Sequence, residues 1–287
     1  MIVFIIPLKS KQVSKDWRHV AKLLERCVRS IVNQTSDKFA VIIVCHERPD
    51  IHIDLPSINY VDVDFPPPQL GQLNVISAMD NDKNRKMWLG LEFAEHLKPS
   101  HVMFVDADDC VSCQIAGFVT HHPDENGWYL NSGYVYEDDS QRIYYKKDNF
   151  YLMSGTSHII KYDLIRNESM NSTYTDSNAA LHQLVVQILA DKKTPLSQLP
   201  FPGAIYIVEN GENINADKAS DRSGREGNLL FIIKNTILNY PRKLRNFINS
   251  QKLTTSLISE YSLIDSTANL REKSTEPEIF YSKEPNS

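Results

Sequence analysis

Three carboxylates within four positions are the feature of the sequence most able to do chemistry. Asp106, Asp108 and Asp109 directly follow the apolar run 101–105 (HVMFV). Crowded like charges repel one another and are costly to desolvate, so they destabilise a fold unless a cation or a solvated loop offsets them. Asp106 and Asp108 point the same way on an extended segment, and their oxygens suit a hard cation such as Mg²⁺ or Mn²⁺. We predict a metal–phosphate site here, the alternative being an acidic helix N-cap.

The elements around this cluster follow the pattern of a parallel α/β sheet. Apolar runs predict buried strands at 2–7, 39–45, 58–63 and 101–105. Helical periodicity predicts helices over 16–33 and 82–97. Strand–helix–strand order predicts a mostly parallel sheet flanked by helices, in which ligands bind at the carboxyl ends of the strands. Pro7, the segment 45–47 and the acidic cluster all stand at such ends, so we expect them at one edge of the sheet.

The second half of the chain has a different character. We expect a tyrosine-rich β-hairpin over 127–147, strands at 157–162 and 204–208, a helix over 176–191 and a helical stretch over 228–251. The tyrosines of the hairpin suit sugar faces and core packing equally well.

Composition is that of an ordinary globular protein. The 287 residues are 41% hydrophobic and 23% charged, and the net charge of −5 gives no reason to expect nucleic acid as a partner. No run approaches the roughly 18 apolar residues of a membrane span, and the first residues are typical of a strand rather than a signal peptide. We therefore expect a cytoplasmic protein. Cys110 and Cys113 lack a second cysteine pair, which disfavours a zinc site.

Taken in order, these features resemble the GT-A-fold nucleotide-sugar glycosyltransferases of the family 2 type, over roughly residues 1–215. The resemblance rests on a first strand ending in Pro7, a helix finishing SIVNQT (30–35), a second apolar strand, a basic helix start (83–86) and FVDADD (104–109). In that family the acidic motif holds a divalent metal that bridges the diphosphate of the sugar nucleotide. Our expected fold is therefore α/β and GT-A-like, with a C-terminal helical extension.

The resemblance also implies a domain organisation. A GT-A-like domain would cover 1–225, with a nucleotide-binding half at 1–110 and an acceptor half at 111–225. The helical extension would cover 226–260, and we expect residues 261–287 to be disordered.

Donor-site residues follow from the same resemblance. Asp108 and Asp109 would hold Mn²⁺ or Mg²⁺, with Asp106 on the metal or on the ribose hydroxyls. Lys83, Arg85 and Lys86 are candidates for nucleotide or phosphate contacts, the alternative being a solvated helix turn.

The nucleoside side of the donor site departs from the family pattern. Pro7 is a candidate there, and so is Glu47, which can accept hydrogen bonds from a base or ribose. Paired aspartates usually end the second strand of the family, whereas this chain has CHERP (45–49). The base therefore stays open between UDP, GDP and others, with a UDP-sugar favoured.

On the acceptor side, the resemblance implies Asp176 as the catalytic base, because the family places its catalytic carboxylate at the head of a corresponding helix. It would deprotonate the acceptor hydroxyl, although helix capping alone also explains it. The turn 155–158 resembles the family's small-residue turn near the acceptor. Segment 209–213 is a turn and a candidate loop closing over the donor.

The function that the resemblance implies is transfer of a sugar, with inversion, to a hydroxyl of a saccharide or lipid-linked acceptor. The basic stretch 242–252 is a candidate contact with an anionic membrane surface, which would place the protein at the inner face of the membrane. Two alternatives remain. One is a non-catalytic carbohydrate-binding or assembly protein on the same fold. The other is a sugar-1-phosphate nucleotidyltransferase, disfavoured because PLKSKQVSKDW (7–17) lacks the glycines of that family's signature loop.

Overall fold

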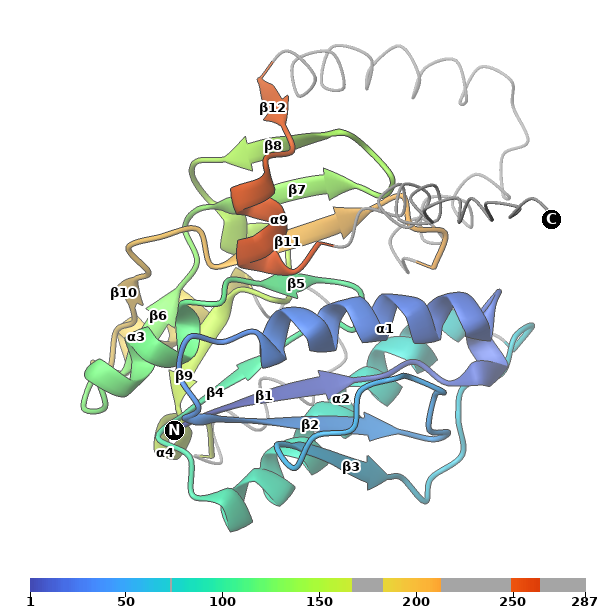
Figure 1. Ribbon diagram of the computed structural model, residues 1–287. Coiled ribbons are helices and arrows are strands. Elements are labelled where there is room, and N and C mark those ends of the chain that lie inside the picture. Colours follow the sequence, from blue (N-terminus) through green and yellow to red (C-terminus); the bar gives the residue numbers. More distant parts are fainter. Residues whose placement is uncertain (73, 167–182, 213–248, 264–287) are drawn as a thin grey trace, which may run out of the picture.

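The computed structural model describes residues 1–72, 74–166, 183–212 and 249–263 (Figure 1). Its central feature is a seven-stranded sheet with the strand order β10-β6-β9-β4-β1-β2-β3. The strands are β1 (Ile2–Pro7), β2 (Phe39–Cys45), β3 (Ile58–Asp62), β4 (His101–Phe104), β6 (Gly127–Tyr129), β9 (His158–Lys161) and β10 (Ser197–Gln198). Strands β4, β1, β2 and β3 are parallel neighbours, while β9 runs antiparallel to both β4 and β6. The predicted α/β fold with a mostly parallel central sheet is confirmed.

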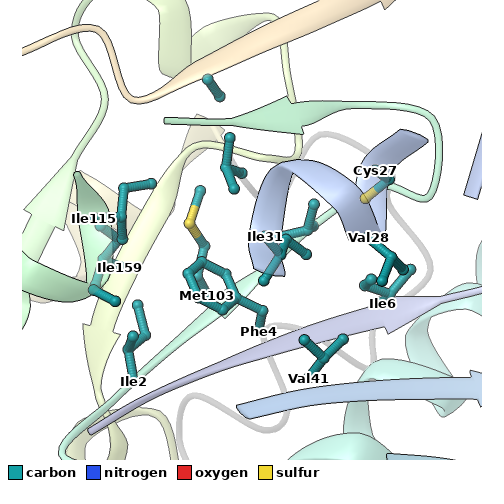
Figure 2. Packing of buried hydrophobic residues seen from close by; sticks show 14 of the residues in the cluster. Ile2, Phe4, Ile6, Cys27, Val28, Ile31, Val41, Met103, Ile115 and Ile159 are labelled. Atoms are coloured by element: carbon teal, nitrogen blue, oxygen red, sulfur yellow. The ribbon is translucent and has the colours of Figure 1, made fainter. Parts of the chain in front are cut away.

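Helices cover both faces of this sheet. On one face lie α1 (Trp17–Val32) and α3 (Ile115–His121), and on the other lie α2 (Val75–Ala94), α4 (Tyr162–Arg166) and α6 (Val185–Asp191). Along β1, Ile2, Phe4 and Ile6 belong to the cluster packed on α1, as Figure 2 shows. Val3 and Ile5 pack in the cluster that includes α2. A strand covered on both faces must be apolar at every position, which is why the run 2–7 is continuous rather than alternating.

A second sheet of five strands lies beside the first, in the order β12-β8-β7-β11-β5. Its strands are β5 (Cys110–Val111), β7 (Gly133–Glu137), β8 (Arg142–Lys146), β11 (Ala204–Val208) and β12 (Ser250–Lys252). Helix α9 (Thr255–Tyr261) packs on it through Leu257 and Tyr261. Short 3₁₀ helices complete the described elements: η1 (Lys11–Val13), η2 (Glu95–Leu97) and η3 (Phe150–Leu152).

Several expected elements differ in their bounds. Helix α2 begins at Val75 instead of residue 82, and the predicted hairpin divides, with 127–129 in the first sheet and 133–146 forming the hairpin. Residues 250–252 form an edge strand on β8, not the end of a helix, because pairing with a distant strand overrides the local pattern.

The ends of the predicted regions are only partly described. Tyr261 and Leu263 are buried, so order extends into the predicted tail as far as residue 263, and 264–287 lie outside the described residues. Most of the basic stretch 242–252 also lies outside the described residues. So do residues 167–182, which include the first part of the predicted helix 176–191. The division into domains stays a prediction. Among the helices in the described ranges, none has the length and apolarity needed to cross a bilayer.

Candidate functional site

Asp106 lies two residues beyond the carboxyl end of β4 and is paired with a lysine of α2. The ammonium of Lys83 contacts its carboxylate, and the Asp106 backbone N–H donates to the Thr156 hydroxyl at 2.9 Å. A Cβ on Gly155 would come within 3.0 Å of the Asp106 carboxylate, so the glycine allows this loop to approach closely. Burial acts to lower the pKa of Lys83, but the nearby Asp106 outweighs it and the pKa is raised. The lysine therefore remains charged at this edge.

Asp108 lies beside this pair and is held by the loop that follows β11. Its Oδ2 accepts a hydrogen bond from the Asn210 amide at 2.8 Å, and Asn210 Oδ1 accepts one from the Glu212 backbone N–H at 3.0 Å. Burial and the neighbouring Asp106 raise the pKa of Asp108. An additional positive charge would offset the repulsion between these two carboxylates.

Asp109 has a different environment. It is fully buried, and its two oxygens accept hydrogen bonds from the Ser154 hydroxyl and the Ile207 backbone N–H, each at 3.1 Å. Burial, together with Asp108 and Asp106, raises its pKa well above the usual range. Its carboxylate connects the acidic segment to strand β11 of the second sheet.

The arrangement suits a divalent metal that takes only some of its ligands from the protein. Within the described ranges, no three or more His, Cys, Asp and Glu side chains form a complete metal centre. Mg²⁺ and similar ions, however, are often held by one or two carboxylates, with phosphate oxygens and water completing the shell. Asp106 and Asp108 match that donor set, whereas both oxygens of Asp109, also predicted as a metal ligand, already accept hydrogen bonds within the protein.

The segment after β2 meets the loop after β1. Glu47 Oε1 accepts a hydrogen bond from the Ser10 hydroxyl at 3.2 Å, and its Oε2 accepts one from the Lys11 backbone N–H at 3.1 Å. The neighbouring His46 turns inward, with Nε2 2.7 Å from Asp82 Oδ1. Pro7 is buried where β1 ends.

Lys86 is a buried partner of Asp82 in this structure. Its side chain is fully buried, and its ammonium donates to Asp82 Oδ2 at 2.6 Å and to the Leu8 carbonyl at 2.7 Å. Burial lowers the pKa of Lys86, although Asp82 opposes this effect. Lys83 and Lys86 were both predicted to contact the donor. In the structure Lys83 contacts Asp106, whereas Lys86 is buried and its ammonium contacts Asp82 and the Leu8 carbonyl.

The loop after β11 packs against the loop after β1. Glu212 is ion-paired with Lys9 at 2.6 Å, and its Oε1 accepts hydrogen bonds from the backbone N–H groups of Lys15 and Asp16 at 2.9 and 2.8 Å. The structure describes the predicted turn 209–213 as far as residue 212, and Asn210 of this turn contacts Asp108. The predicted base Asp176 lies outside the described residues.

Two residues of this region were not predicted from the sequence, Asp82 and Ser154, and Asn210 was predicted only as part of the segment 209–213. The spacing of Asp82 four residues before Lys86 is a helical ion-pair signal that was available. No local signal marks Ser154, or the contact of Asn210 with Asp108, because the two residues in each contact are 45 and 102 positions apart.

No family model matches the chain, and no curated protein matches it. Among solved structures, TarS from S. aureus is 13% identical over 72% of this chain and 60% of its own, with a TM-score of 0.44. TarS in complex with UDP-GlcNAc is 12% identical over 75% of this chain and 60% of its own, with a TM-score of 0.44. A protein of Desulfovibrio desulfuricans assigned as a nucleotide-diphospho-sugar transferase is 12% identical over 72% of this chain and 80% of its own, with a TM-score of 0.34.

The likeness to these structures is low in both identity and TM-score, and this chain spans 60% of the length of the matched TarS chain. The fold assignment therefore rests on the topology of this chain. Its mostly parallel sheet between helices, with the acidic segment at the end of β4, is the arrangement that the sequence resemblance predicts.

Proposed function

We propose that the protein is a glycosyltransferase that moves a sugar from a nucleotide diphosphate sugar to a hydroxyl acceptor. The observation that carries the proposal is the pair Asp106 and Asp108 beside the charged Lys83, at the carboxyl end of a parallel sheet. Ligands bind at this end in open α/β sheets. A site with both carboxylates and a fixed cation suits a diphosphate bridged by a divalent ion.

Each residue has a proposed task in this reaction. Asp106 and Asp108 would hold Mn²⁺ or Mg²⁺, which when bound neutralises charge on the diphosphate leaving group. Lys83 would orient Asp106 and add positive charge near the phosphates. Glu47, partly exposed at the end of β2, would accept hydrogen bonds from the ribose or base of the donor, for which UDP is favoured. Asp109 would hold the acidic segment in place from within.

The role proposed for Asp176 in binding and activating the acceptor rests on the sequence resemblance. Asp176 would act as the base that takes the proton of the acceptor hydroxyl, with inversion at the sugar carbon. A saccharide or a lipid-linked saccharide would be the acceptor. The basic stretch 242–252 is the proposed contact with a membrane surface, at its inner face in a cytoplasmic protein.

A thermal-shift panel tests the donor site directly. UDP, GDP, CDP and dTDP are each added with Mn²⁺ and again with EDTA, since a ligand that binds only the folded state raises the melting temperature. We expect one nucleotide to raise it with Mn²⁺ and to lose the effect with EDTA. Asp108→Asn should abolish that shift.

The matched control is Asp124→Asn, which alters an exposed acid between α3 and β6, away from the acidic segment. It should leave the nucleotide shift intact. Absence of a shift with all four nucleotides contradicts the donor site. The non-catalytic alternative is favoured instead if a nucleotide binds but no nucleoside diphosphate is released from its sugar derivatives with a panel of saccharide acceptors.

A further inference from the structure

One turn of helix α2 contacts the carboxyl end of four adjacent parallel strands. From β4 to β3 across the sheet, the contacts are Lys83 with Asp106, Lys86 with the Leu8 carbonyl, Asp82 with His46, and Arg85 with the ring of Phe65. The Arg85 guanidinium carbon lies 3.6 Å from the centroid of that ring. Each strand end thus has its own partner within residues 82–86.

Two of these contacts hold the loops that position Glu47. Asp82 holds His46, the residue directly before Glu47. Lys86 holds the carbonyl of Leu8, at the start of the loop whose Ser10 and Lys11 donate hydrogen bonds to the Glu47 carboxylate. The Asp82–Lys86 pair therefore restrains Glu47 from both of the loops that set its position.

Stability alone does not require this pair to be charged. The side chains of Lys86, Asp82 and His46 are 0, 8 and 6% exposed, so all three polar groups are desolvated. Replacing a buried ion pair by apolar side chains of similar volume is often neutral or stabilising, whereas removing one partner leaves a costly unpaired charge. What the charges supply here is direction, because each fixes a hydrogen-bonding group of a different loop.

We infer that Asp82 and Lys86 are positioning residues that set nucleoside selection by orienting Glu47, while Lys83 acts separately at the Asp106 end. The inference rests on the proposed nucleotide-sugar donor site and deepens it. A residue that acts through Glu47 should change which nucleoside is preferred and should leave the metal requirement intact.

The test compares wild type with the double variant Asp82→Leu/Lys86→Met, which removes both charges together with the hydrogen bonds to His46 and to the Leu8 carbonyl and leaves no unpaired ion. The matched control is Glu25→Gln/Arg29→Met, which removes an i, i+4 ion pair of the same spacing on α1. Calorimetric titrations with UDP, GDP, CDP and dTDP in Mn²⁺ give the ratio between the weakest and the tightest affinity. We expect the ratio to fall about tenfold in the double variant, equivalent to ~1.4 kcal/mol, and to stay unchanged in the control. Loss of binding on adding EDTA should persist in both.

A second measurement keeps the inference testable whether or not nucleotides bind. Hydrogen exchange of segments 8–12 and 45–49 should be faster in the double variant than in wild type and should be unchanged in the control. His46→Phe, which keeps a ring against Phe65 but removes the bond to Asp82, should accelerate exchange in 45–49 even if the double variant fails to fold.

The outcomes separate the two proposals. A folded double variant with wild-type selectivity overturns the positioning role, and so does unchanged exchange in both segments. Wild-type protein that binds no nucleotide overturns the donor site, and faster exchange in the variants would then support the structural coupling without the nucleoside role.

Discussion

The two ends of strand β4 accommodate polar side chains by opposite means. At its amino end, His101 is fully buried, its Nε2 lies 2.9 Å from the Glu125 carbonyl, and burial lowers its pKa. At its carboxyl end, Asp106 is about a quarter exposed and is paired with Lys83, whose pKa is raised. A buried group is tolerated either when it becomes neutral or when a partner keeps its charge. The Asp106–Lys83 pair takes the second course, and its partial exposure leaves charge within reach of a ligand.

The first prediction concerns the acid at the carboxyl end that should act on stability. Asp109→Ala removes the acceptor of the Ser154 hydroxyl and the Ile207 N–H, and we expect it to lower the free energy of unfolding by about 2–3 kcal/mol. Asp109→Asn keeps an acceptor and relieves the crowding of charges, so it should be close to wild type. Urea denaturation measures both variants. Equal destabilisation by Ala and Asn would contradict the hydrogen-bonding role.

The second prediction concerns Lys83. Lys83→Met removes the cation beside Asp106, and we expect metal-dependent nucleotide affinity to fall about tenfold, equivalent to ~1.4 kcal/mol. The melting temperature should change little, because the pair is partly solvated, with side chains 35 and 25% exposed. Titration calorimetry and thermal melting measure the two effects. A large loss of stability with unchanged nucleotide affinity would show that Lys83 stabilises the fold, as His101 does, and does not serve a ligand.

The third prediction uses pH at the amino end. Unfolded histidine has a pKa near 6.5, and that of folded His101 is lower, so the unfolded state binds more protons between these two values. Stability should therefore fall as pH drops below about 6.5, with His101 contributing at most ~1.4 kcal/mol per pH unit. His101→Phe should flatten the slope between about pH 6.5 and 5 in urea titrations. Identical slopes for the two proteins would show that His101 does not carry the effect.

The smallest effect is expected at a surface ion pair on the carboxyl edge. Arg48 and Asp62 are 57 and 58% exposed, and solvent screens such pairs. Arg48→Ala should leave the melting temperature unchanged within error. A clear loss of stability would show that solvent-exposed ion pairs stabilise this edge, and it would contradict the expectation that Lys83→Met changes the melting temperature little.

Much of the framework was predictable because it is local in the sequence. A doubly covered strand such as 2–7 must be apolar throughout, and the buried positions of α1 recur with helical spacing from Val20 to Ile31. The gathering of Glu47 and Asp106 at one edge also follows, since parallel strands end on the same side. In the second sheet, the hairpin β7–β8 and strand β11 were predicted, but two-residue β5 and three-residue β12 were not, because such short strands have no periodicity of their own.

By itself, the sequence determined the parallel α/β framework and the place of the acidic segment at the end of a strand, because both follow from periodicity and order along the chain. Only the tertiary structure decided the separate roles within that segment. Asp109 accepts a hydrogen bond from a backbone N–H 98 residues away. On α2, Lys86 is buried against the Leu8 carbonyl, while Lys83 contacts Asp106. Which of several adjacent charges is buried depends on partners that are distant in the sequence, and only the packed fold brings those partners together.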